Sequence, residues 1–238
     1  MTALRLLGIE VPWTLEDDKR VHAVLPRRGE RPQRPELHAH FCGRDGLSVV
    51  ELDGLRVTSP AQTWIHLAAD LDEDGLVVLG DSLLRRKAAM TTPTALRSLL
   101  GRFPGARGVR RARAALELIR PGTDSSMETR ARLLLVRAGL PCPAVNGPAK
   151  GVDGEFLALP DMSYPELKIA IEYDGDIHRT DPDTWRRDVE RRQRLQENRW
   201  LIITVTADDV IREQERFVRR VASARAARSR LVERVGHL

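Results

Sequence analysis

The chain carries a group of acidic residues around one apolar segment. Asp161 comes first, Glu172 and Asp174 follow after ten residues, and His178 lies four residues further on. Residues 167–171 alternate apolar with other side chains, which predicts a β-strand. Carboxylates gathered at one sheet edge repel one another unless a cation lies among them, and oxygen-rich sites of this kind suit Mg²⁺ or Mn²⁺.

The geometry of a strand would bring these acids together. Side chains at i and i+2 share a strand face, so Glu172 and Asp174 are expected to point the same way, about 7 Å apart. A preceding strand over residues 155–163 would run back alongside and bring Asp161 near the pair. His178 would lie just past the strand end, where an imidazole can move protons near neutral pH.

Each of these residues also has a simpler structural interpretation. A buried carboxylate needs a partner, so Glu172 and Asp174 could pair with Arg187 or Arg191 of the next predicted helix. Asp161 could be an ordinary turn residue. A lone histidine such as that at position 178 is more often structural than catalytic.

The helix predicted over residues 182–197 supplies further candidates. Trp185, Asp188 and Arg191 are spaced three residues apart, so they form one ridge. Asp188 and Arg191 could orient the carboxylates, whereas Trp185 could be a supporting core residue. Arg187 and Arg191 are the candidate contacts to a nucleic-acid phosphate.

The ordered set of residues resembles the PD-(D/E)xK nuclease superfamily. Its branch related to very-short-patch repair endonucleases has a lone Asp followed by E-x-D-G-x-x-H. That pattern corresponds here to Asp161, Glu172, Asp174, Gly175 and His178. Most of the superfamily has lysine at the position of the second acid in this signature.

The resemblance covers roughly Ser125–Val221 and implies a fold and an activity. The fold would be a restriction-endonuclease-like mixed sheet flanked by helices. The activity would be metal-dependent hydrolysis of a DNA phosphodiester, with Mg²⁺ or Mn²⁺ held by Asp161, Glu172 and Asp174. His178 would assist proton transfer.

Two positions outside the signature bear on this resemblance. Glu128, in the first turn of a helix predicted over residues 125–139, is implied to face the site, although a first-turn acid is also favoured by the helix dipole alone. Arg199 stands where the family usually has glycine before Trp200. A left-handed residue is expected there, which Asn198 could supply by a shifted turn.

The first half of the chain carries a second resemblance. Residues 57–64 read VTSPAQTW and residues 80–85 read GDSLLR, which is similar to a middle region of abortive-infection antitoxin-like proteins. Those proteins often carry the same nuclease-like domain at the C-terminus and usually begin with a winged helix, which this chain is expected to lack. The family often has Arg where Gln62 stands and Asp where His66 stands, so a polar contact there is expected to be lost.

The segment Pro121–Ser126 is the predicted domain boundary. Residues 1–120 are expected to form an antitoxin-like α+β region and residues 121–238 an α/β endonuclease-like domain. In the first region we predict strands at 37–41, 48–52 and 55–58 and helices at 59–69, 76–86, from 92, and at 109–119. In the second we predict, in order, helix 125–139, strands near 143–146, at 155–163 and at 167–174, helix 182–197, strand 200–205 and helix 207–228.

Composition limits the class of protein. No apolar run approaches the roughly 20 residues that span a bilayer, and the N-terminus has no signal-peptide core. Cys42 and Cys142 are widely separated and are interpreted as reduced thiols. These features predict a cytoplasmic protein without a membrane partner. His38, His40 and Cys42 alternate as if on one strand face, but no fourth zinc ligand has convincing spacing.

The charge permits nucleic-acid binding without requiring it. The net charge is +5, and only four of the 39 basic residues are lysines. Arginine-rich usage also follows from genome base composition.

Taken together, the acidic residues and the nuclease resemblance predict a Mg²⁺-dependent endodeoxyribonuclease with DNA as partner. The alternatives are a non-catalytic, antitoxin-type regulator that binds DNA or protein, and a structural domain whose acids pair with arginines.

Overall fold

The chain divides into two compact units, Met1–Pro121 and Gly122–Leu238, so the division lies next to the boundary expected from sequence. The computed structural model describes the whole chain except residues 26–33, 43–45, 176–181 and 236–238 and the side chains of residues 182–185. Within the described residues, every sheet draws its strands from one unit only.

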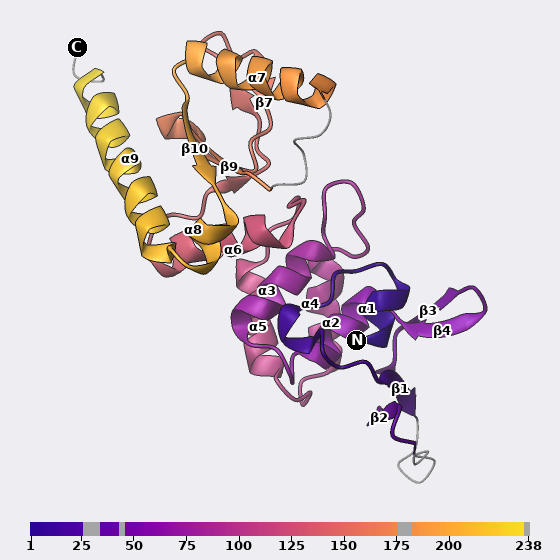
Figure 1. Cartoon of the computed structure of the whole chain (residues 1–238). Coiled ribbons are helices and arrows are strands. Elements are labelled where there is room, and N and C mark those ends of the chain that lie inside the picture. Colours follow the sequence, from indigo (N-terminus) through magenta and orange to yellow (C-terminus); the bar gives the residue numbers. More distant parts are fainter. Residues whose placement is uncertain (26–33, 43–45, 176–181, 236–238) are drawn as a thin grey trace. The chain divides into compact units, whose positions relative to one another are not determined.

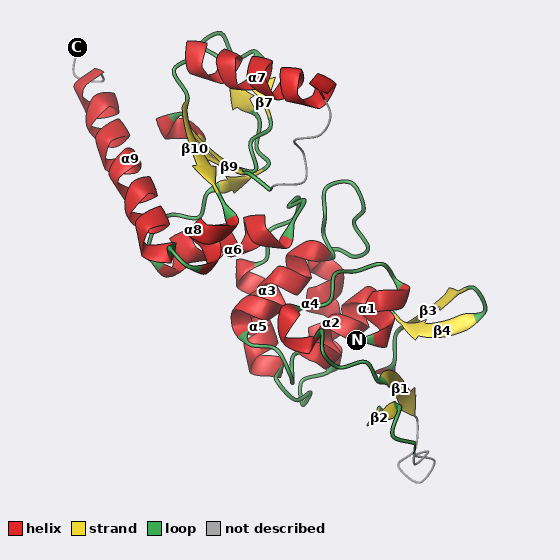
Figure 2. Cartoon of the chain, in the orientation of Figure 1, coloured by secondary structure: helices red, strands yellow, loops and turns green. Residues whose placement is uncertain are grey.

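The first unit is built mainly of helices (Figure 2). Trp64 is fully buried, and its indole Nε1 donates to the carbonyl oxygen of Leu76 at 2.8 Å, which ties two helices together. Ser59 and Thr92 cap helices by accepting from backbone N–H groups. The helices are α1 (Thr2–Leu6), α2 (Pro60–Leu67), α3 (Glu73–Ser82), α4 (Pro93–Arg102) and α5 (Val109–Leu118).

Two strand pairs complete the first unit. Strands β3 (Val49–Leu52) and β4 (Leu55–Thr58) form the predicted antiparallel hairpin. Asp53 and Gly54 both have positive φ at its turn, as a tight hairpin turn requires. Strand β2 (Leu37–Phe41) pairs in parallel with β1 (Val21–Leu25), a strand the sequence did not predict.

The second unit contains the expected mixed sheet, in an α/β arrangement. The strand order is β10-β9-β8-β5; β9 and β10 run parallel, whereas the other two neighbouring pairs are antiparallel. A separate antiparallel pair lies outside this sheet. The strands are β5 (Ala144–Val145), β6 (Ala149–Lys150), β7 (Phe156–Ala158), β8 (Met162–Tyr164), β9 (Ile169–Tyr173) and β10 (Leu201–Val205).

Helices cover both faces of this sheet (Figure 1). Ile169 and Ile171 of β9 belong to a core cluster shared with helices α6 and α9. Ala170, on the opposite face, packs in a second cluster with Leu195 of α7. Burial on both faces explains the nearly continuous apolar run of β9. The helices are α6 (Ser126–Arg137), α7 (Pro182–Glu197), α8 (Ala207–Ile211) and α9 (Gln214–Val235).

In the first unit, the helix predicted at 76–86 is displaced to Glu73–Ser82. Three predicted elements of the second unit also differ from the structure. Instead of one strand over residues 155–163 there are two, β7 and β8, which pair with different partners. The strand expected to begin at 167 begins at Ile169, because Pro165–Leu167 form a 3-10 turn and Lys168 has φ +49. In place of the single helix expected over 207–228 there are two, because α8 ends at Ile211 and α9 begins at Gln214.

Within the described ranges, no helix combines the length and apolar character needed to cross a bilayer.

Candidate functional site

Glu172 lies on the face of β9 that α7 covers. Its side chain is buried, with 4% of the residue exposed. Arg191 of α7 donates to both carboxylate oxygens, with distances of 2.8 Å to Oε1 and 3.2 Å to Oε2. Arg192 adds a third cation contact, with its Nε 3.7 Å from Oε2. The pairing with Arg191 was one of the two interpretations that the sequence left open.

Asp188 completes the ridge expected on α7. Its Oδ1 lies 3.5 Å from Arg191, one turn further along the helix. Arg191 of α7 therefore pairs with two carboxylates: that of Asp188 on the same helix and that of Glu172 on β9. Arg187 is exposed on the same helix. Arg192 was not among the predicted residues; the run of arginines on α7 was the signal that could have found it.

Asp161 is fixed to the strand that carries Glu172. It immediately precedes β8, and its Oδ2 accepts a hydrogen bond from the backbone N–H of Tyr173 at 2.8 Å. The backbone carbonyl of Asp161 accepts from Asn146 N–H at 3.0 Å. The antiparallel pairing of β8 with β9 thus brings Asp161 to the end of β9, as expected from sequence.

Glu128 enters from the first turn of α6 and is buried. Its carboxylate accepts from the Asp124 backbone N–H at 2.9 Å and from the Ser125 hydroxyl at 2.8 Å. Ser125 in turn accepts from the Glu128 backbone N–H, so the two residues cap the helix together. Glu128 is therefore a first-turn acid that takes part in capping α6, and its role in a site stays a prediction.

Electrostatics link the three acids. Burial, and then the negative charge of Asp161, raise the pKa of Glu128 to about 7. Burial also raises the pKa of Glu172, Arg191 opposes that rise, and Asp161 adds to it. Asp161 therefore repels both neighbours, and burial together with this repulsion allows Glu128 to hold a proton near neutral pH.

Asp174 differs from the other predicted metal ligands. It follows the last residue of β9 and is half-buried, and its backbone N–H donates to the Val205 carbonyl oxygen at 2.8 Å. The charge interactions described above involve Glu128, Asp161 and Glu172, and the place of Asp174 among the metal ligands stays a prediction.

A hard divalent cation fits the chemistry of these donors, since they are carboxylates that repel one another in a buried place. The described residues nevertheless contain no group of three or more histidine, cysteine or acidic side chains already arranged to hold a metal ion. At Glu172 both carboxylate oxygens already accept from Arg191. A metal ion at this carboxylate would have to share it with that guanidinium or displace the guanidinium.

Two predicted site residues have no described side chain. His178 lies outside the described residues, and so does the side chain of Trp185.

Arg199 adopts the left-handed conformation expected at its position. Its φ is +64, so Arg199 itself makes the turn, and the shifted turn at Asn198 does not occur. Trp200 follows, is buried, and donates from Nε1 to the Lys150 carbonyl oxygen at 3.0 Å. This turn connects α7 to β10.

In the first unit, the expected loss of contact between Gln62 and His66 is wrong. Gln62 Nε2 lies 2.9 Å from His66 Nε2, and Gln62 Oε1 accepts from the Ser48 backbone N–H, which orients the amide as the donor to the imidazole. A hydrogen bond between the two side chains thus links these positions.

The alternating histidines of β2 form a stack instead of a zinc site. The rings of His38 and His40 lie 4.6 Å apart, and both stack on His22 of β1. His22 Nδ1 lies 2.8 Å from His40 Nε2, and its other ring nitrogen lies 3.2 Å from Asp18. The sequence missed His22 because β1 was not predicted.

Comparison with known proteins gives relatives without an assigned activity. Proteins from two strains of Mycobacterium tuberculosis, both named only as uncharacterized, are 29% identical over 221 residues, which cover 93% of this chain and 78% of each relative. No family model matches the chain. No solved structure matches it either.

Proposed function

We propose that the C-terminal unit is a metal-dependent nuclease that hydrolyses phosphodiester bonds in DNA. The observation that carries this proposal is the convergence of Glu128, Asp161 and Glu172 from a helix, a loop and a strand at one end of a mixed sheet. Buried carboxylates whose pKa values are raised by burial and by a neighbouring acid, as at Glu128 and Glu172, are candidates for a functional site.

The order of elements supports the same proposal. The nuclease resemblance implies a particular set of elements, and the unit contains them. They are a helix with a first-turn glutamate, three strands of the mixed sheet, a second helix and a fourth strand that runs parallel to its neighbour. In that arrangement Asp161 immediately precedes β8, and Glu172 lies on β9, the antiparallel neighbour of β8.

The roles of the residues follow from their contacts. Mg²⁺ or Mn²⁺ held by Asp161, Glu172 and Asp174 would supply a polarised phosphate oxygen and a bound water of lowered pKa. Arg191 presents a fork of donors that suits a phosphate as well as a carboxylate, so it can turn from Glu172 to the substrate. Glu128 can exchange a proton near neutral pH because its pKa is about 7. Proton transfer by His178 and a cytoplasmic location remain predictions.

The test is cleavage of labelled DNA and RNA with Mg²⁺ or Mn²⁺. Glu172→Gln and Asp161→Asn should each abolish metal-dependent cleavage, and the double variant should be no worse, since one site fails as a unit. Glu190→Gln, an exposed acid on α7, is the matched control and should cut at the wild-type rate. Cleavage that survives Glu172→Gln at full rate would overturn the assignment.

A second candidate is a non-catalytic regulator that binds DNA or protein through a nuclease-like fold. The bidentate pair between Arg191 and Glu172 favours it, because that pair satisfies the buried carboxylate without a metal. A purified protein that binds nucleic acid, cuts none of a wide panel with either metal, and gains no stability from millimolar Mg²⁺ would support the regulator.

A further inference from the structure

The basic charge of the chain is concentrated in one segment. Between Ser82 and Thr123 there are ten basic residues and a single acidic one, Glu117, a net charge of +9, whereas the whole chain has +5. The rest of the chain is therefore net negative. A bias toward arginine from genome composition would replace lysine, but it does not explain why acidic residues are missing from this one segment.

The segment lies in the first unit and includes α4 and α5. Most of its basic side chains are exposed. Three of them, Arg107, Arg110 and Arg113, lie on and just before α5, and within the described residues none of the three has a carboxylate partner. The exposed basic residues are Arg86, Lys87, Arg97, Arg102, Arg107, Arg110, Arg111 and Arg113.

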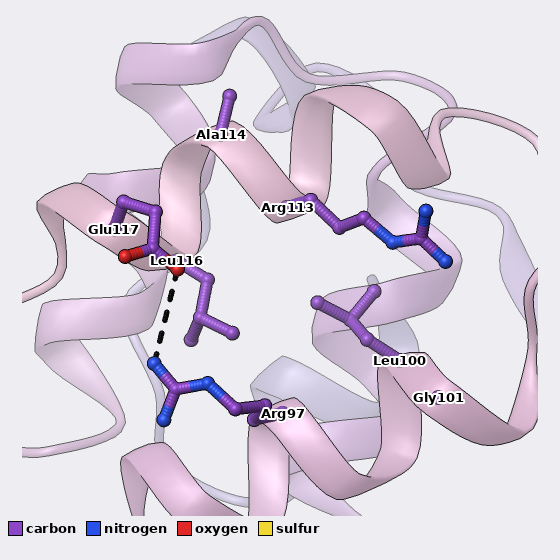
Figure 3. A pocket seen from close by; sticks show the side chains of 7 residues that line it. All are labelled: Arg97, Leu100, Gly101, Arg113, Ala114, Leu116 and Glu117. Carbon is purple, nitrogen blue, oxygen red and sulfur yellow. Dashed lines mark ion pairs between the residues drawn. The ribbon is translucent and has the colours of Figure 1, made fainter.

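A groove of about 530 Å³ runs between α4 and α5. Arg97 of α4 and Arg113 of α5 line it from opposite sides, and the side chains of Leu100 and Leu116 point into the space between them (Figure 3). The single acid of the segment, Glu117, lies 3.8 Å from Arg97 in an exposed ion pair. Such a pair contributes little, so Arg97 can exchange it for another anion.

The scaffold beneath this surface is fixed. Gly108 precedes α5 with φ +80, and a Cβ there would come within 1.9 Å of the Ala68 carbonyl oxygen, so the helix starts in close contact with the segment after α2. Arg111 donates to the carbonyl oxygens of Ala68 and Leu71, which holds the next turn. Arg107, Arg110 and Arg113 therefore project from a helix start that is packed against the segment after α2.

We propose that this α4–α5 surface binds the sugar-phosphate backbone of a nucleic-acid duplex. Arginine forks match phosphate oxygens in pairs, and a segment with nine more positive than negative charges attracts a polyanion. None of the described side chains that line the groove is aromatic, so it is suited to the backbone and not to stacked bases. The proposal goes beyond the nuclease assignment and does not depend on cleavage by the other unit.

The experiment measures binding of the full chain to a labelled duplex of about 20 base pairs in EDTA, where the proposed metal chemistry cannot contribute. The triple variant Arg107→Gln, Arg110→Gln, Arg113→Gln should bind at least about tenfold more weakly. The slope of log affinity against log salt should become less steep by roughly 0.9 for each phosphate contact that is lost, which is about 3 for the three arginines. DNA and RNA duplexes are compared in parallel.

The matched control removes the same charge elsewhere. Arg212, Arg216 and Arg219 are exposed and pair with acids near α9, so their triple change to Gln should leave affinity and salt slope close to wild type. The triple change Arg107→Lys, Arg110→Lys, Arg113→Lys should keep most of the salt slope of the wild type, because the positive charges remain. Circular dichroism checks that every variant is folded.

Three outcomes would overturn the proposal: no duplex binding by the wild type at about 50 mM salt, equal losses in the α5 triple variant and the control, or binding to anionic phospholipid vesicles but not to duplexes. Cleavage is measured separately, with metal present. A protein that binds duplexes through α5 but never cuts them would overturn the nuclease assignment and leave the binding proposal intact.

Discussion

At Glu172, burial and charge oppose each other. Glu172 is 4% exposed; burial raises the pKa of its carboxyl, and the two donors of Arg191 oppose that rise. A cation bound at this carboxylate would share it with the guanidinium of Arg191. The two candidate functions of the unit therefore differ in what they expect when Arg191 is replaced.

Arg191→Gln should separate them. Without metal, the variant loses about 1–3 kcal/mol, because Glu172 is left as a buried, poorly paired charge. With millimolar Mg²⁺ the nuclease proposal expects a larger rise in Tm than in the wild type, since the metal no longer competes with a guanidinium.

Thermal unfolding with and without Mg²⁺ measures both effects. Arg187→Gln on the same helix is the control, because Arg187 is exposed, and it should change neither quantity. If Mg²⁺ stabilises Arg191→Gln no more than the wild type, competition for Glu172 is not what limits metal binding.

At the scale of the elements, the turn from α7 into β10 carries backbone strain. Arg199 has φ +64, a conformation that costs a residue with a Cβ about 1–2 kcal/mol. Glycine relieves this cost but gains freedom in the unfolded chain, which offsets about 0.4–1 kcal/mol. We therefore expect Arg199→Gly to raise the free energy of unfolding by roughly 0.5–1 kcal/mol.

Urea denaturation of the full chain checks this prediction. Arg194→Gly, in the last turn of α7, should instead lower stability by about 1 kcal/mol, as glycine does within a helix. A loss of stability in Arg199→Gly would mean that the arginine side chain makes a contact worth more than the strain.

The histidine stack between β1 and β2 makes the first unit sensitive to acid. Burial lowers the pKa of His22 and His66, and lowers that of His40 to about 4. The groups that face these rings are His38 on β2, Asp18 before β1, Asp70 after α2 and the α-amino group of Met1. Protonation would place cations side by side in the stack.

A histidine whose pKa is lowered in the folded state binds fewer protons than it does unfolded. The stability it contributes is therefore complete above the ordinary pKa near 6.5 and falls as the pH drops toward about 4. His40→Gln should flatten this fall in stability between those two pH values. Denaturation of both proteins at a series of pH values measures it, and parallel curves would exclude a role for His40.

At the scale of the whole molecule, each unit has a core of its own. In the second unit, β9 is buried on both faces by clusters that draw only on residues after Gly122. Trp64 of the first unit is anchored to Leu76 of the same unit. Separate cores are the physical basis for independent folding.

The fragment of residues 122–238 should therefore unfold cooperatively when expressed alone, with a sigmoidal melt followed by circular dichroism. A shorter fragment, residues 122–200, lacks β10 and α9 and should not, because β9 would lose one strand partner and the helix that covers one face. A gradual, non-cooperative melt of the longer fragment would show that its core is incomplete without the first unit.

The sequence predicted those elements whose signals are local. Helix α6 begins at Ser126, next to the predicted start at 125, and the helix predicted over 182–197 has those bounds in the structure. The periodicity of β9 and the positive φ at the end of α7 were also predictable, since each depends on a few neighbouring residues. The break between β7 and β8 was not, because it depends on their pairing with two different strands.

The sequence by itself determined which residues can do chemistry: the acids at 128, 161, 172 and 174, and an arginine-rich segment with almost no acids. Only the tertiary structure decided their partners. It placed Arg191 on Glu172, the Tyr173 amide on Asp161, and Arg97 opposite Arg113 across one groove. The physical reason is that charge and periodicity are properties of single residues and their neighbours in the chain. The pairing of buried charges depends instead on which helix face packs against which strand.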